Sequence, residues 1–294
     1  MAAADGSIGH ENVTVTAGDG LRLNVRVYGG PVAGRLPLLC LAGLSRNGAD
    51  FDVLARALAG ARQVIAPDYR GRGLSDRDPN WQNYALPVEL QDLLAVTTAL
   101  GIEKAVFLGT SRGGILTMMM TAVRPGLIGG AILNDIGPVI DATGLARIKS
   151  YLGKLPEPAS WDEAVALLKS INSARFPALS DDDWRRQASA MWQMVEGRLT
   201  VAFDPALAKT LEGLTFDTEM PTLWPQFDGL ADVPVMVIRG EHSDILSAAT
   251  VSAMTERRPD LDVLTVAGQG HAPLLMDELS ISRVAAFARR CDPA

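Results

Sequence analysis

The chain has 294 residues, of which 48% are hydrophobic and 21% are charged, so it is long and apolar enough to bury a substantial core. This composition excludes a disordered chain and a disulfide-stapled mini-protein. The formal net charge is −7, and lysine and arginine are scattered along the sequence rather than clustered. We therefore expect neither nucleic acid nor a membrane as a partner.

The N-terminal sequence MAAADGSIGHENVTV lacks the basic start and the apolar run of a secretory signal. No uncharged apolar run reaches the ~18 residues that a membrane span needs. These features predict a cytoplasmic protein. With two cysteines, three histidines and no CxxC pattern, the sequence offers little for a metal site, and no metal is expected.

Short apolar runs alternate with helical patterns up to about residue 136, which is typical of βαβ units in a mostly parallel sheet. The strands predicted here are 12–17, 21–28, 36–42, 63–67, 104–109 and 128–134. The first two are joined through Gly18-Asp19-Gly20 and are expected to form a hairpin. Helices are predicted over 50–59, 88–100 and 112–123.

The same alternation returns near residue 226. It predicts strands over 235–239 and 262–266 and helices over 247–257 and 274–289, so the sheet has about eight strands. Residues 137–225 carry helical patterns, with caps at Ser160 and Ser180, and almost no strand signal. We predict one core domain made of 1–136 and 226–294, with 137–225 as a helical cap over whatever site the sheet presents.

Four of the five tryptophans lie in the predicted cap. Trp161 and Trp192 are candidate substrate contacts. The alternative is that these aromatic side chains only fix the cap to the core.

One motif carries chemistry. The sequence Gly109-Thr110-Ser111-Arg112-Gly113 follows a predicted strand and opens a predicted helix, which is the context of a GxSxG nucleophile elbow. A serine hydroxyl needs a base to take its proton. Of the three histidines, His10 lies in a predicted tail and His242 beside a strand end. His271 follows the last predicted strand and completes the order Ser…Asp…His, so it is the candidate base.

With these residues, the chain resembles the α/β-hydrolase fold family, in the branch with a serine nucleophile and a helical cap. The run 67–75, PDYRGRGLS, is similar to the DxxGxGxS turn of many members, and the insertion falls after the sixth strand, where family caps lie. The run 41–44, LAGL, is at the place of the oxyanion loop, with Ala-Gly instead of His-Gly. The resemblance implies a mostly parallel eight-stranded sheet flanked by helices. No motif in the sequence suggests a cofactor, and none is expected.

In that fold the oxyanion hole consists of two backbone amides. Here they would belong to Arg112, which follows the nucleophile, and to Leu44 in the loop after the third strand. The side chains of Arg46 and Arg112 lie near these positions in the sequence, and either could contact a substrate carboxylate. The alternative is that both are ordinary surface arginines.

Two carboxylates could orient His271. Most family members carry this acid in a GxxD pattern at the end of strand seven, but that slot, counted from Gly240, holds Ser243. Asp244 comes one residue later. Asp135 ends the sixth strand, where some family branches carry the acid, and we favour it while Asp244 stays open.

The resemblance implies a serine hydrolase that cleaves a small-molecule carboxylic ester or lactone through an acyl-enzyme intermediate, acting as a monomer or homodimer. Amide or carbon–carbon bond hydrolysis uses the same triad and is the alternative. A lyase, an oxygenase or a receptor on the same fold is a further alternative. Because cap side chains set specificity, the sequence does not identify the substrate.

Overall fold

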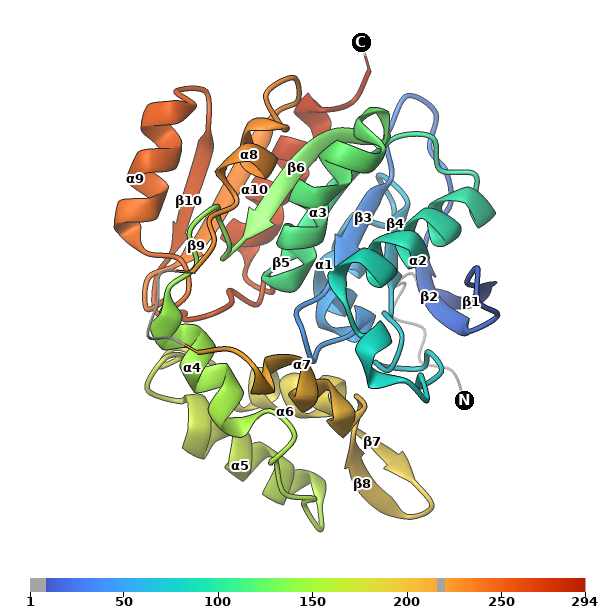
Figure 1. Ribbon diagram of the computed structural model, residues 1–294, viewed down its shortest axis with the longest axis vertical. Helices are drawn as coiled ribbons and strands as arrows, with labels where there is room; N and C mark the ends of the chain where they lie inside the picture. The colour runs from blue at the N-terminus through green and yellow to red at the C-terminus, as the bar shows by residue number, and fades with distance from the viewer. Residues whose placement is uncertain (1–8, 216–219, 294) are drawn as a thin grey trace.

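The computed structural model describes residues 9–215 and 220–293 of the chain (Figure 1). Its centre is an eight-stranded sheet with the strand order β1-β2-β4-β3-β5-β6-β9-β10. β1 and β2 pair antiparallel, as do β2 and β4, and the remaining neighbours pair parallel. The strands are β1 (His10–Thr16), β2 (Arg22–Tyr28), β3 (Leu38–Leu41), β4 (Val64–Pro67), β5 (Ala105–Thr110), β6 (Ile128–Asn134), β9 (Val235–Gly240) and β10 (Asp262–Val266).

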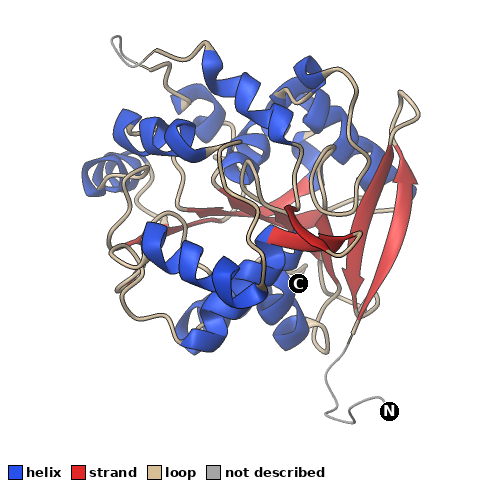
Figure 2. Ribbon diagram, turned by 90° about the horizontal axis from the view of Figure 1, so that it is seen from below, coloured by secondary structure: helices blue, strands red, loops and turns tan. Residues whose placement is uncertain are grey.

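Helices cover both faces of this sheet (Figure 2). One face packs against α2 (Leu86–Ala99), α3 (Arg112–Val123), α8 (Trp224–Asp228) and α9 (Ala248–Arg257), and the other against α1 (Asp52–Leu58) and α10 (Glu278–Arg290). Successive β3 side chains enter opposite core layers, as the period of two of a strand requires. No helix in the described residues is long and apolar enough to cross a membrane.

Residues 142–212, called the insertion below, lie beyond one end of the sheet (Figure 1, lower part). It contains α4 (Ala142–Tyr151), α5 (Trp161–Asn172), α6 (Asp181–Met191), β7 (Trp192–Val195), β8 (Arg198–Val201) and α7 (Lys209–Glu212). Ser160 and Ser180 cap α5 and α6, as predicted. The insertion has a small core of its own, around Leu168, Trp184 and Trp192.

The β-hairpin of β7 and β8 is a feature that the sequence analysis missed, since it predicted almost no strand in the insertion. Glu196 and Gly197, at its turn, have φ angles of 48° and 79°. Positive φ at both central residues is the geometry that a two-residue hairpin turn needs. A glycine between two alternating runs was therefore the available signal.

One further expectation was wrong. His10 does not lie in a tail, because it begins β1 and its ring packs 5.1 Å from the Tyr28 ring. The predicted domain boundary at residue 225 cuts through α8, which packs against α3. A Cβ added at Gly229, directly after α8, would lie 2.4 Å from Thr121 Oγ1. α8 therefore packs with the sheet rather than with the insertion.

Candidate active site

Ser111 occupies the turn between β5 and α3. Its φ of 52° and ψ of −114° are a strained backbone conformation for a residue with a side chain. The glycines on either side permit this turn. A Cβ added at Gly109 would lie 2.4 Å from the Gly113 backbone, and one added at Gly113 would lie 2.2 Å from the Leu41 carbonyl oxygen. The hydroxyl therefore projects from the carboxyl end of the sheet, as the motif predicted.

His271 lies between Ser111 and a buried carboxylate. Its Nε2 is 2.9 Å from Ser111 Oγ, and its Nδ1 is 2.8 Å from Asp135 Oδ2. Because a carboxylate only accepts hydrogen bonds, Nδ1 carries the proton and Nε2 is left to accept from the serine hydroxyl. Asn134 ties the histidine loop to the sheet, since its side-chain amide donates to the Pro273 carbonyl at 3.0 Å.

Asp135 follows β6 with a φ of 56°, and its side chain is fully buried. Besides His271, its carboxylate accepts hydrogen bonds from the Gly240 amide at 2.7 Å and the Ser243 hydroxyl at 2.6 Å. Ser243 stands in the GxxD slot. The residue at the usual position of the acid therefore donates to the carboxylate that lies against His271.

Asp244 points elsewhere. Its carboxylate accepts hydrogen bonds from Arg147 of α4, with Nε at 2.5 Å and Nη2 at 2.8 Å. Burial alone would raise the pKa of Asp244, but the hydrogen bonds and charge of Arg147 hold this pKa below its usual value. The structure thus places Asp135, and not Asp244, at the histidine.

Two backbone amides are available beside Ser111. Arg112 is the first residue of α3, so its N–H has no partner within the helix. Leu44 lies in the loop after β3 and lines the same cavity as Ser111. The two loops are close, since a Cβ added at Gly43 would lie 3.8 Å from Ser111 Cβ.

The Arg112 side chain turns away from the cavity. Its Nε lies 2.6 Å from Glu89 Oε2, and its Nη2 donates to the Tyr84 carbonyl at 3.0 Å. The prediction that this guanidinium could contact a substrate carboxylate is therefore wrong. The guanidinium instead forms an ion pair with Glu89, whose side chain is fully buried.

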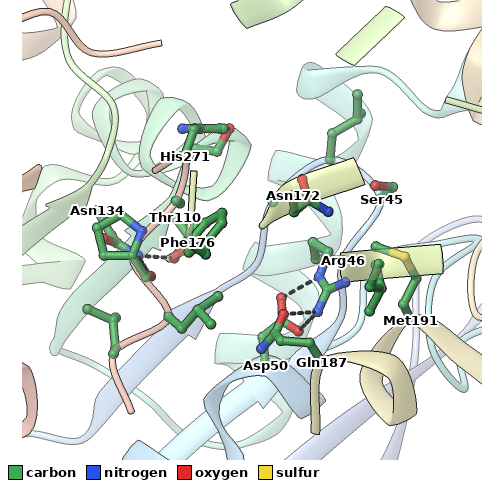
Figure 3. A pocket seen from close by; sticks show the side chains of 18 of the residues that line it. Ser45, Arg46, Asp50, Thr110, Asn134, Asn172, Phe176, Gln187, Met191 and His271 are labelled. Carbon is green, nitrogen blue, oxygen red and sulfur yellow. Dashed lines mark hydrogen bonds and ion pairs between the residues drawn. The ribbon is translucent and has the colours of Figure 1, made fainter. Parts of the chain in front are cut away.

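Ser111 lines a cavity of about 160 Å³. Figure 3 shows other side chains of its lining, among them Thr110, Phe176 and His271. This volume is close to that of an engineered cavity that binds benzene. Its walls come from the loop after β3, from the His271 loop and from α4, α5 and α6 of the insertion. The apolar lining includes Ile148, Leu168, Phe176, Leu179, Trp184, Met191 and Leu274. A mostly apolar cavity with a few polar groups is typical of a small-molecule site.

Two arginines are among the polar groups that line the cavity. Arg46 donates to Asp50 at 2.8 Å and to Gln187 of α6 at 3.0 Å (Figure 3). Arg147, paired with Asp244, also lines the cavity. Each guanidinium therefore already has a carboxylate partner from the protein.

The two tryptophans proposed from the sequence as substrate contacts do not line the cavity. Trp161 is 40% exposed, and Trp192 is 1% exposed within the core of the insertion. The indole that does line the cavity belongs to Trp184, which packs edge-on against Phe176 with ring centroids 6.5 Å apart. Trp192 packs among side chains of the insertion itself, so the expected alternative, that these tryptophans fix the cap to the core domain, does not describe it.

A family model described as "alpha/beta hydrolase fold" matches residues 37–277. The chain belongs to this family. This hydrolase is 32% identical to a 3-hydroxybutyrate-oligomer hydrolase of Cupriavidus necator, over 89% of this chain and 90% of the relative. It is 29% identical to a 2-(acetamidomethylene)succinate hydrolase of Mesorhizobium japonicum, over 85% of each chain. A crystal structure of an alpha/beta hydrolase from Novosphingobium aromaticivorans is similar with a TM-score of 0.90 and 39% identity, covering 97% of this chain and 100% of that one.

Several polar residues of the hydrolase site were not singled out from the sequence as site residues: Asn134, Arg147, Tyr151, Gln187 and Glu89. Asn134 had a signal, because it ends the strand that precedes Asp135. The others lie on helices, where nothing in the periodicity distinguishes a side chain facing a cavity from one facing solvent.

Proposed function

We propose that this hydrolase cleaves a carboxylic ester or lactone of a small molecule through an acyl-enzyme on Ser111. The observation that carries the proposal is the continuous hydrogen-bonded chain from Ser111 Oγ through His271 to Asp135, with distances of 2.9 and 2.8 Å, at the floor of a cavity. Nucleophile, base and orienting acid within hydrogen-bond reach are the signature of nucleophilic acyl transfer.

In the first step Ser111 Oγ attacks the carbonyl carbon while His271 Nε2 takes the hydroxyl proton. Asp135 accepts from Nδ1–H, which fixes the tautomer and stabilises the imidazolium that forms. His271 then gives the proton to the departing alkoxide, leaving an ester between Ser111 and the acyl group. Water attacks this ester with His271 again as the base, and the carboxylic acid leaves.

The negative charge that develops on the carbonyl oxygen requires donors in place before the reaction. The amides of Leu44 and Arg112 are the donors we assign, each typically contributing ~2.7–4 kcal/mol to lowering the barrier. Because backbone groups supply this hole, Ala42 in place of the family's usual histidine does not remove a donor.

We assign the insertion the role of a cap, because α4, α5 and α6 supply much of the cavity wall over Ser111. The relatives support an ester first, since oligomers of a hydroxy acid such as 3-hydroxybutyrate are joined by ester bonds. An amide is the second candidate, favoured by the relative named for an acetamido compound. The same triad acts on both bonds.

Fluorophosphonate labelling tests the proposal without knowledge of the substrate. The protein and its Ser111→Ala variant are incubated with the reagent, and their intact masses are measured. We expect one adduct on the protein and none on the variant. An unlabelled, folded protein, or an adduct that persists on Ser111→Ala, would contradict the assignment.

A matched pair of acyl compounds then separates the two bond types. 4-Nitrophenyl butyrate carries an ester, and 4-nitrobutyranilide carries an amide with the same acyl group. We expect a higher kcat/KM for the ester, measured by release of the chromophore. A higher kcat/KM for the anilide would favour the amide reading.

A further inference from the structure

We propose that Arg72 and Glu89 are positioning residues that hold the two amides of the oxyanion hole in fixed relation to each other. This inference rests on the proposed function, because it concerns the donors that we assign to Leu44 and Arg112. Neither Arg72 nor Glu89 lines the cavity over Ser111, so both act through the residues they hold.

Arg72 lies in the turn after β4, and its side chain is fully buried. Its Nε donates to the Leu44 carbonyl at 2.9 Å, and its Nη1 donates to the Arg70 carbonyl at 2.7 Å. Leu44 is the residue whose amide supplies one of the two proposed donors. Arg72 therefore fixes the orientation of the backbone on the loop side of the hole.

Glu89 of α2 links Arg72 to the other side of the hole. Its carboxylate is fully buried, with Oε1 2.8 Å from Arg72 Nη2 and Oε2 2.6 Å from Arg112 Nε. Arg112 supplies the second proposed donor from its amide. A chain of charged groups thus runs from the Leu44 carbonyl through Arg72 and Glu89 to the residue directly after the nucleophile.

Stability alone does not account for this chain well. Burying charged groups carries a large desolvation penalty, and apolar side chains of similar volume commonly give equal or greater stability. Two guanidiniums share one carboxylate here, so Arg72, Glu89 and Arg112 together carry one net positive charge. The guanidinium charge that Glu89 does not balance makes this burial costlier still, so we assign the chain a positioning role rather than a stabilising one.

The backbone of Arg72 is itself held by the insertion. Arg72 forms an isolated antiparallel bridge with Phe203, and the Gly73 amide donates to the Ala202 carbonyl at 2.8 Å. The Asp204 amide donates to the Gly71 carbonyl at 2.7 Å. The position of the insertion on the core therefore bears directly on the residue that holds Leu44.

Arg72→Lys is the first test. Lysine keeps the positive charge but lacks the planar fork that reaches the Leu44 and Arg70 carbonyls and Glu89 at once. With 4-nitrophenyl butyrate we expect kcat to fall about tenfold to a hundredfold, while KM stays within about twofold. The reason is that a displaced Leu44 amide weakens its hydrogen bond to the oxyanion, and this bond forms only in the transition state. The rate of phosphonylation of Ser111 should fall by a similar factor.

Glu89→Gln is the second test, and it alone tests the positioning role if Arg72→Lys does not fold. Glutamine keeps the shape but removes the charge that joins the two arginines. We expect kcat to fall about tenfold at an unchanged KM, since charge-assisted bonds are roughly twice as strong as neutral ones.

Arg70→Lys is the matched control. Arg70 is two residues away and as buried, but its side chain pairs with Asp19, Asp78 and Asp92, outside the site. We expect this variant to lower the melting temperature while kcat stays within about twofold of the unaltered protein.

The inference is overturned if both test variants keep the original kcat, if only KM changes, or if Arg70→Lys loses as much kcat as Arg72→Lys. In each case normal labelling of the unaltered protein at Ser111 leaves the proposed function standing. Absence of labelling in the unaltered protein would instead contradict the proposed function itself.

Discussion

The loops that follow β6 and β9, neighbouring parallel strands, each carry an aspartate, and the two carboxylates have different surroundings. Asp135 is fully buried and accepts from Gly240, Ser243 and His271. The Asp244 side chain is 22% exposed and faces Arg147 of α4. Both meet the requirement of chain order, so the donors around each carboxylate, and not its place in the sequence, decide its role.

Ser243 connects the two loops. It lies directly before Asp244, yet its hydroxyl points at Asp135 and also accepts from the Leu246 amide at 3.0 Å. The loop after β9 thus donates a hydrogen bond to Asp135 of the β6 loop, while its own Asp244 pairs with Arg147 of the insertion. Four predictions test this division.

Asp135→Asn should have the largest effect. An asparagine cannot stabilise the imidazolium and favours the wrong tautomer, so we expect kcat with 4-nitrophenyl butyrate to fall by about 10⁴. Circular dichroism shows whether the variant is folded. A loss of less than about tenfold in a folded variant would remove Asp135 from the triad.

Ser243→Ala should have the next largest effect. It removes one hydrogen bond to the ionised carboxylate, and bonds to charged groups contribute about 1.5–3 kcal/mol. We expect kcat to fall about tenfold in the same assay. Ser247→Ala is the matched control, because Ser247 caps α9 and its loss should lower stability by about 1 kcal/mol without changing kcat. Equal kcat losses in both variants would show that Ser243 acts only through stability.

Asp244→Asn should change kcat by less than about threefold, because this carboxylate makes no hydrogen bond to His271. A change in KM is expected instead, since Arg147 lines the cavity and loses its partner. A loss comparable to that of Asp135→Asn would mean that the two loops exchange roles in solution.

The effect of Asp244 on stability should depend on pH and be the smallest of the four. The pKa of Asp244 is raised by burial but lowered further by Arg147, so its net position is below the usual value. A depressed pKa contributes stability that is present above the unfolded pKa of about 3.9 and is lost as pH falls through the folded one. Urea unfolding should show the protein about 1 kcal/mol more stable than Asp244→Asn at pH 7, and the difference should shrink below pH 4. A difference that is constant or grows toward low pH would contradict the Arg147 pairing.

The sheet was predictable because its strands are apolar runs bounded by glycine and proline. The predicted ranges 128–134 and 262–266 agree with β6 and β10, and 112–123 agrees with α3. Most other predicted strands and helices begin or end one or two residues away from the observed elements. The last helix was predicted from residue 274 but begins at Glu278, because Asp277 caps it through the Ser280 amide.

The site was predictable only where a motif is contiguous. Ser111 stands in a pattern of five residues that forces the turn, and His271 was selected from three histidines. The acid could not be fixed in the same way, because its donors come from two separate segments, the end of β9 with Gly240 and Ser243, and the loop of His271. The cavity wall was least predictable. Trp184 and Trp192 both belong to the core of the insertion, and only the packing around them leaves Trp184 at the cavity and Trp192 enclosed.

The most direct measurement is the rate of fluorophosphonate labelling of Ser111 in Asp135→Asn and Asp244→Asn side by side. This reaction needs the activated serine but no knowledge of the substrate. We predict that Asp244→Asn is labelled within about threefold of the rate of the unaltered protein, and Asp135→Asn at least about a thousandfold more slowly. Slow labelling of Asp244→Asn together with normal labelling of Asp135→Asn would contradict the assignment of the acid.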